Sequence, residues 1–105
     1  EGQPASAITD LDRALQLSPR AANAYYARGQ AHAALGDQAA AIADFTQALA
    51  LQPEYSEALL ARALAYHATS RDDLARADMA TLAPLTLDPT LQSAADALQR
   101  ELPGQ

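Results

Sequence analysis

Residues 7–19 read AITDLDRALQLSP, and residues 41–53 read AIADFTQALALQP. Seven of the thirteen positions are identical when Ala7 is aligned with Ala41. Residues 24–34 recur at the same offset as residues 58–68, and Arg28 then matches Arg62. Each period carries two helical patterns, so the repeat predicts a helix pair as the structural unit.

Proline and glycine divide the chain into helices. Pro19 and Pro53 separate successive helices, and Gly36 suits the left-handed position after a helix, with Asp37 able to cap the next one. Ser70 replaces the glycine in the second unit, and residues 70–73 predict a capping box with Asp in place of Glu. Pro84 predicts an early helix end and an irregular connection over residues 83–88. The expected helices cover residues 3–17, 21–35, 38–51, 55–69, 71–83 and 89–102.

Composition supports an all-α fold. The chain of 105 residues holds 28 Ala and 16 Leu but only two Ile and no Val, which disfavours a sheet. No apolar run is long enough for membrane insertion, and the first residues do not resemble a signal peptide. The localisation stays open, with the cytoplasm slightly favoured.

Charge and cysteine content exclude several function classes. The net charge is −6, and the seven basic residues are all Arg and are scattered along the chain, so no nucleic-acid partner is expected. The absence of Cys excludes thiolate catalysis and zinc–sulfur sites. Abundant Ala and Arg without Lys is typical of a GC-rich, bacterial genome.

The sequence offers no catalytic constellation. The two histidines, His32 and His67, lack metal-ligand spacing, and there is no glycine-rich phosphate loop or nucleophile motif. We expect His32 to pack between helices and His67 to lie on the inner surface. The prediction is therefore a protein that is not an enzyme, with no catalytic residues, no metal and no cofactor.

Two Arg–Asp pairs recur at a fixed spacing. The number of residues between Arg28 and Asp44 is the same as the number between Arg62 and Asp78. We expect structural ion pairs, either within a repeat or across to the next one. The alternative is that these arginines bind a ligand carboxylate. Asp10 would be a third member of the series, with its arginine outside this sequence.

Residues 22–55 resemble a tetratricopeptide repeat (TPR), a helix–turn–helix unit of about 34 residues. The positions that carry the resemblance are Tyr25, Gly29, Ala41, Phe45, Ala48 and Pro53, while Arg28 and His32 depart from the family pattern. In the next unit the same places hold Leu59, Arg62, Ala63, Tyr66, Ala75, Met79 and Leu82. Leu82 replaces a small residue, and the closing Pro89 comes two residues late.

The resemblance implies a right-handed superhelical solenoid of about six antiparallel helices. Residues 1–105 would form a single TPR domain: residues 1–19 the second helix of a truncated repeat, 20–53 a full repeat, 54–89 a divergent repeat and 90–105 a C-terminal capping helix. The chain would then be a fragment of a larger TPR protein.

The resemblance also implies a protein- or peptide-binding surface on the concave side, lined by the first helix of each pair. By helical spacing this face would carry Asn23, Tyr26, Gln30, Ala33, Glu57, Leu60, Leu64 and His67. Family members that bind chaperone tails hold a C-terminal carboxylate with Lys, Arg and Asn. The matching places here are Tyr26, Ala27, Gln30 and Ala61, so no such ligand is expected.

The predicted function is a non-catalytic protein–protein interaction scaffold that binds an apolar or amphipathic segment of a partner. One alternative is homo-oligomerisation through exposed terminal helices, where Ile8, Leu11 and Leu15 would be partly uncovered. The other alternative is a substrate-recruiting domain of a larger enzyme. The partner, the process it serves and the number of repeats in the parent protein are not encoded in these residues.

Overall fold

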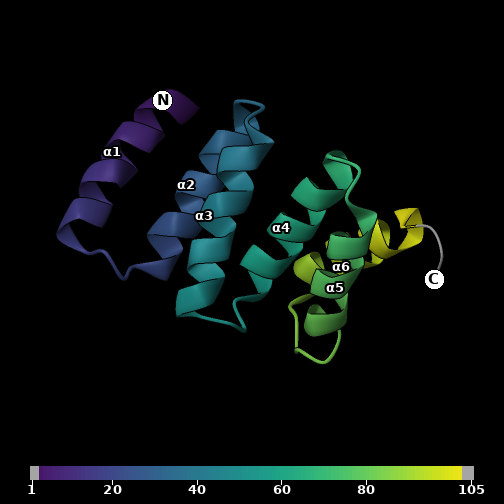
Figure 1. The fold of residues 1–105 in the computed structure, drawn as a ribbon. Helices are drawn as coiled ribbons and strands as arrows, with labels where there is room; N and C mark the ends of the chain where they lie inside the picture. The colour runs from purple at the N-terminus through teal and green to yellow at the C-terminus, as the bar shows by residue number, and fades with distance from the viewer. Residues whose placement is uncertain (1–2, 103–105) are drawn as a thin grey trace. The chain divides into compact units, whose positions relative to one another are not determined.

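A computed structural model describes residues 3–102 (Figure 1). The helices in this part of the chain are α1 (Pro4–Leu17), α2 (Ala22–Ala34), α3 (Gln38–Leu51), α4 (Ser56–Ala68), α5 (Asp72–Leu82) and α6 (Pro89–Glu101). Each lies within one residue of its predicted start and end, and residues 3–102 contain no strand. The six predicted helices are confirmed.

The chain divides into two compact units, residues 1–53 and residues 54–105. The first unit contains α1, α2 and α3, and α2 packs against both of the others. Its best-covered side chains come from α3, where Ala41 and Ala48 are fully buried and Phe45 is almost so. Two alanines one turn on either side of a phenyl ring allow α3 to approach α2 closely while the ring fills the space between them.

Gly29 on α2 is the point of closest approach within this first unit. A Cβ atom built on Gly29 would lie 2.5 Å from Cε1 and 2.7 Å from Cδ1 of Phe45. Phe45 is 2% exposed, so its ring has little room to withdraw. The glycine is therefore required by packing on the phenyl ring rather than by backbone conformation.

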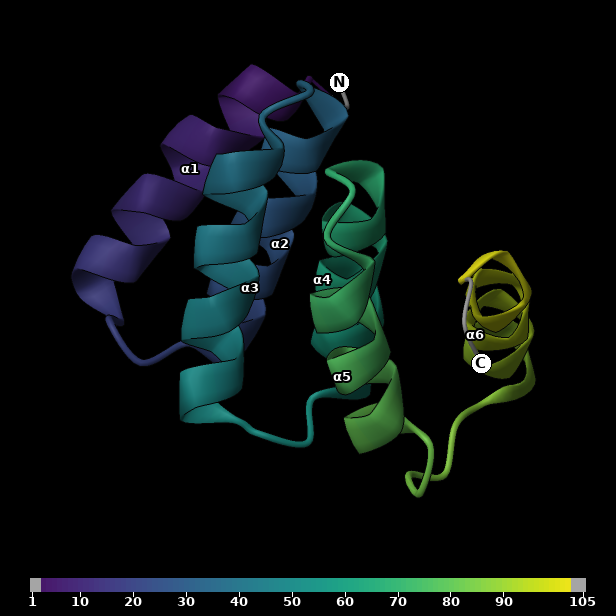
Figure 2. The ribbon, with the colours of Figure 1, turned by 45° about the vertical axis from the view of Figure 1, so that its right-hand side comes forward.

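The second unit contains α4, α5 and α6. The antiparallel hairpin of α4 and α5 is its main body, and Figure 2 shows the two helices side by side. The hairpin core includes Ala58, Ala63 and Ala75, which are fully buried, together with Leu82 at 2% exposure. The repeat thus uses small residues at the helix contact in both units.

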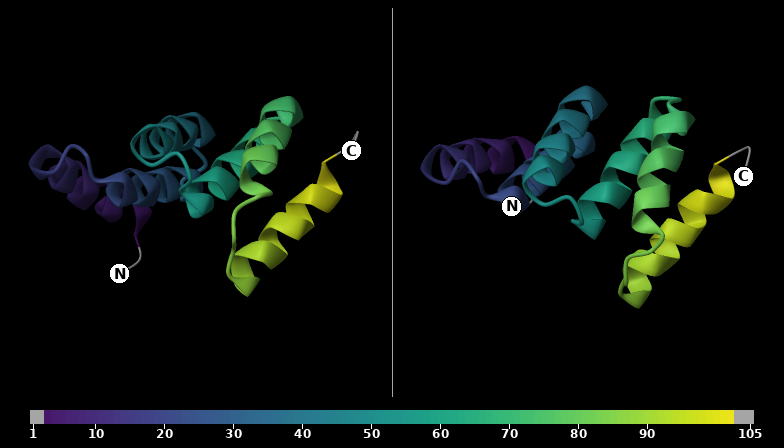
Figure 3. Two further views of the ribbon diagram at one scale, coloured as in Figure 1. Left: turned by 90° about the horizontal axis from the view of Figure 1, so that it is seen from below. Right: turned by 60° about the horizontal axis from the view of Figure 1, so that its bottom comes forward.

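Residues 83–88 have no regular structure, and the chain reverses there before α6 begins at Pro89 (Figure 3). This confirms the early helix end predicted from Pro84. Asp88 caps α6 by accepting a hydrogen bond from the Leu91 amide at 2.7 Å. The inner side of α6 buries Ala95, Leu98 and the following Leu102.

The two hairpin turns have the same backbone geometry. Gly36 has φ +84°, and its amide donates to the Ala33 carbonyl. The Asp37 amide donates to the His32 carbonyl. Asp37 then caps α3 by accepting from the Ala40 amide at 3.1 Å. The predicted roles of Gly36 and Asp37 are both confirmed.

The capping box predicted at residues 70–73 is wrong. Ser70 has φ 62° and occupies the left-handed position that Gly36 holds in the first turn. The Ser70 amide donates to the His67 carbonyl, and the Arg71 amide donates to the Tyr66 carbonyl. Arg71 is consequently the N-cap residue of α5, without a capping side chain. Serine suits either role, and the hydrogen bonds that close the preceding helix decide between them.

Candidate functional site

A part-buried ion pair in the first unit joins Arg28 to Asp44. Arg28 on α2 donates from Nε and Nη2 to the two carboxylate oxygens of Asp44 on α3, both at 2.8 Å. The Asp44 side chain is 7% exposed and that of Arg28 is 23% exposed. This is the parallel two-bond geometry in which a guanidinium fits a carboxylate best.

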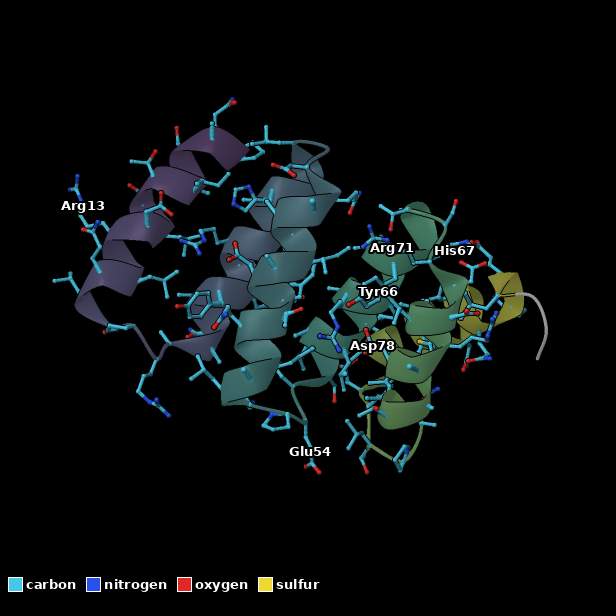
Figure 4. All side chains as sticks on the ribbon, in the orientation of Figure 1. Arg13, Glu54, Tyr66, His67, Arg71 and Asp78 are labelled. Carbon is cyan, nitrogen blue, oxygen red and sulfur yellow. The ribbon has the colours of Figure 1, made fainter. Side chains whose placement is uncertain are left out.

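The second unit repeats this arrangement. Arg62 on α4 donates from Nε at 2.8 Å and from Nη2 at 2.6 Å to the two oxygens of Asp78 on α5. Figure 4 labels Asp78, whose side chain is 7% exposed. The structure thus brings together both pairs that their shared sequence spacing singled out, each within its own helix pair.

A tyrosine ring backs each arginine. Cζ of Arg28 lies 5.5 Å from the ring centre of Tyr25, and Cζ of Arg62 lies 5.6 Å from that of Tyr66. The tyrosine precedes the arginine in the first repeat and follows it in the second. The hydrogen bonds that Arg28 donates to Asp44 and Arg62 donates to Asp78 raise the pKa of each arginine. These contacts engage both arginines within their own helix pairs.

Arg28 has a further partner that the sequence reasoning missed. Its Nη1 donates to Asp12 of α1 at 2.8 Å, so the guanidinium joins all three helices of the first unit. Asp12 lies as many residues before Arg28 as Asp44 lies after it. This equal spacing is the sequence signal that could have identified Asp12 as a partner. The proposed third member of the series, Asp10, is exposed on α1.

The predicted docking residues of α2 are partly accessible. Asn23 and Gln30 are exposed, and Tyr26 and Ala33 are half-buried. Gln30 donates from Nε2 to the Tyr26 hydroxyl at 2.9 Å, and the Tyr26 ring lies 5.9 Å from that of Phe45. Tyr26 is therefore anchored in the core of the first unit and presents its hydroxyl end outward.

The predicted docking residues of α4 differ more strongly in exposure. Glu57 is exposed and Leu64 is 47% exposed, whereas Leu60 is 4% exposed. Leu60 therefore offers almost no side-chain surface, and the accessible apolar residue of the set is Leu64. His67 is half-buried and engaged with two carboxylates of its own unit.

The two histidines have different environments. Nε2 of His32 lies 3.7 Å from Oδ2 of Asp44, between α2 and α3. Nδ1 of His67 lies 2.8 Å from Oδ1 of Asp72, and its Nε2 lies 3.3 Å from Oε1 of Glu101. Within residues 3–102 no three side chains of His, Cys, Asp or Glu are grouped to hold a metal ion.

A small cavity lies at the seam between α5 and α6. It has a volume of about 160 Å³ and is lined by Met79, Leu82, Ala83, Leu87, Gln92, Ala95, Asp96 and Gln99. The lining combines apolar side chains with the polar Gln92, Asp96 and Gln99 of α6. None of the helices in the described residues is long and apolar enough to cross a membrane.

Comparisons with known proteins agree on one family. A family model described as "TPR repeat" matches residues 1–36, and two described as "Tetratricopeptide repeat" match residues 22–55 and 39–91. The last of these covers just over half of the chain. No curated protein matches the chain by sequence.

A solved structure supports the same assignment. The crystal structure of the P58(IPK) TPR domain is 25% identical in sequence and superposes with a TM-score of 0.88 over 96% of this chain. This chain spans only 28% of that crystallised chain. The all-α TPR-type fold predicted from the repeat is confirmed. With matching helix pairs, matching family models and this structural likeness, the chain belongs to the tetratricopeptide repeat family.

Proposed function

We propose that this chain is a non-catalytic scaffold that binds an apolar or amphipathic segment of a partner protein on the accessible face of α4 in the second unit, with the equivalent face of α2 serving in the same way in the first unit. Tetratricopeptide repeats generally mediate protein–protein interaction, and the family and its structural neighbour point to a repeat scaffold without catalysis. The residues on these two helix faces indicate which kind of segment is bound.

The observation that carries the proposal is the exposure of Leu64 in the middle of α4. A single exposed leucine is common on protein surfaces and has no meaning by itself. Leu64, however, lies on the helix face that the family resemblance assigns to partner binding, one turn after the buried Leu60. On α2 the corresponding face combines an amide, an anchored tyrosine and alanine. Such surfaces suit side chains of an amphipathic segment.

The arginines do not contribute to this surface as anion receptors. Arg28 donates from three nitrogen atoms to Asp44 and Asp12. A ligand carboxylate at Arg28 would have to displace an aspartate of the same unit. This supports an apolar rather than an anionic ligand.

The test is peptide selection on the full chain from a displayed random library, followed by affinity measurements with two matched variants. Leu64→Glu places a charge at a position that is 47% exposed on α4, and Leu74→Glu does so at 46% exposure on α5. We expect Leu64→Glu to weaken binding of the selected peptides about tenfold or more, equivalent to about 1.4 kcal/mol, and Leu74→Glu to have little effect.

Circular dichroism of both variants checks that the helices are retained. Equal weakening by the two variants would place the binding site elsewhere, and failure to select any apolar or amphipathic peptide would contradict the proposal. Leu60 is unsuitable as a probe because a carboxylate there would be buried and would destabilise the unit.

Self-association is the second candidate, and one observation favours it. Leu17 at the end of α1 is 81% exposed, the highest value among the large apolar residues of the described chain. A mass that rises with concentration in sedimentation experiments, and that returns to 11.0 kDa in a Leu17→Glu variant, would support association through α1.

A further inference from the structure

His67 lies at the junction of the three helices of the second unit. It belongs to the last turn of α4, Asp72 is the first residue of α5, and Glu101 is the last residue of α6. Figure 4 shows His67 on the side of the hairpin that faces the end of α6. Each ring nitrogen faces one carboxylate, at 2.8 Å for Nδ1 and 3.3 Å for Nε2.

The protonation state of His67 decides how many of these contacts are favourable. The imidazolium carries a proton on both nitrogens and can donate to Asp72 and to Glu101 at once. A neutral ring carries one proton, so the lone pair of its other nitrogen would face a carboxylate. Only the charged ring joins all three helices.

Apart from the apolar face on which Ala95, Leu98 and Leu102 are buried, helix α6 has few attachments to the α4–α5 hairpin. Its contact with α4 is much smaller than the contact between α4 and α5. The seam with α5 contains the cavity of about 160 Å³, where packing atoms are missing. Glu101 also opposes the dipole of its own helix, so the carboxylate favours α6 only through its partner.

We propose that His67 is a pH-sensitive latch that holds the last turn of α6 against the α4–α5 hairpin through Glu101. When the latch opens, α6 moves away from its seam with α5 and uncovers Met79 and Leu82, which are buried when α6 is docked. This device concerns the docking of α6 and does not depend on the peptide-binding surface proposed above.

The direction of the pH dependence follows from linkage. The hydrogen bond to Asp72 and the charges of Asp72 and Glu101 raise the pKa of His67 above its ordinary value of 6.5. The charged groups that face His67 from α5 and α6 are these two carboxylates, and both favour the imidazolium. While Asp72 and Glu101 are ionised, the latch is therefore formed below pH 6.5 and is lost as the pH rises through the raised pKa of His67.

Solvent limits the size of the effect. The side chains of His67 and Glu101 are 30% and 67% exposed, so water and salt screen their interaction. We therefore expect a change in the local docking equilibrium of α6 while the hairpin itself stays folded.

The test is hydrogen–deuterium exchange of the full chain at about pH 5.5 and about pH 8.5, expressed as protection factors so that the intrinsic pH dependence of exchange is removed. Protection of α6 is expected to fall about twofold or more at the higher pH, with α4 and α5 unchanged. Added salt should reduce the difference between the two pH values.

Two variants identify the groups involved. Glu101→Gln should make the protection of α6 independent of pH, while the His67 resonances still titrate with a raised pKa because Asp72 remains. His32→Gln, which removes the other histidine, should leave the pH effect intact. Protection of α6 that is the same at both pH values in the unmodified chain would overturn the proposal. A full pH effect that persists in Glu101→Gln would overturn it equally.

Discussion

At the residue scale, the molecule is organised by a guanidinium in each helix pair. Asp44 and Asp78 are both 5% exposed as whole residues, and every buried polar side-chain atom in the described chain has a hydrogen-bond partner. A buried carboxylate is costly without its cation, so each aspartate depends on the arginine of its own helix pair.

Removing Arg28 should therefore cost more than the pair contributes. We expect Arg28→Ala to lower the free energy of unfolding by about 1–3 kcal/mol, because it leaves Asp44 buried without a charged donor. The double variant Arg28→Ala with Asp44→Ala should be less destabilised than the sum of the single variants, by about 1 kcal/mol or more.

Urea denaturation of the four proteins measures this coupling. Arg13→Ala, on the exposed side of α1, is the control for the loss of a positive charge and should change stability by less than about 0.5 kcal/mol. Strict additivity of the single variants would show that the two side chains act independently.

The second prediction at this scale concerns Gly29 and Phe45. Replacing glycine by alanine within a helix normally stabilises it by about 1 kcal/mol. Here the added methyl group meets the buried Phe45 ring, and such overpacking costs about 1–3 kcal/mol. We expect Gly29→Ala to be destabilising overall in thermal unfolding.

The second repeat shows how the conflict is relieved. Alanine stands there as Ala63, and the position equivalent to Phe45 holds Met79, a more flexible side chain. The cost of Gly29→Ala should shrink when Phe45→Met is introduced with it. A stabilised Gly29→Ala single variant would show that α3 shifts freely and that the close approach is not a constraint.

At the scale of the elements, the two hairpin turns offer a matched experiment. Gly36 and Ser70 occupy equivalent positions of the two repeats, both with positive φ. We expect Ser70→Gly to stabilise the chain by about 0.5–1 kcal/mol. A serine in the left-handed conformation costs about 1–2 kcal/mol, but glycine raises the conformational entropy of the unfolded chain, which offsets part of the gain.

The reciprocal change should have the opposite sign. Gly36→Ser is expected to destabilise by about 1 kcal/mol, and backbone strain is the cause because no atom lies within 4 Å of a Cβ built on Gly36. Unfolding curves of the two single variants and of the swap test this. A neutral result in both would mean that the turns tolerate side chains at this position.

The helices were predictable from sequence because their ends are marked by local chemistry. Pro19, Pro53 and Pro84 cannot continue a helix, and the turn at Gly36 needs a left-handed residue. The function of Ser70 was predicted wrongly because serine is common at caps. Its conformation is decided by hydrogen bonds to the end of α4 that no local pattern reports.

At the scale of the whole molecule, the repeat spacing predicted pairings better than it predicted surfaces. The constant separation of Arg and Asp pointed to the partners of Arg28 and Arg62, since equivalent positions in a repeat meet in equivalent ways. The docking face was implied by the family resemblance, and its residues were assigned by helical spacing, which does not report how deeply neighbouring side chains cover Leu60 or what His67 contacts.

The pairing of Arg28 with Asp44 and of Arg62 with Asp78 has an evolutionary consequence. Each pair lies within one helix hairpin, so a segment one repeat long carries its own charge compensation. Duplication or deletion of such a segment would not strand a buried aspartate. Gene rearrangement can thus lengthen or shorten such an array at low electrostatic cost, and protein engineers could insert further copies of the same segment on the same principle.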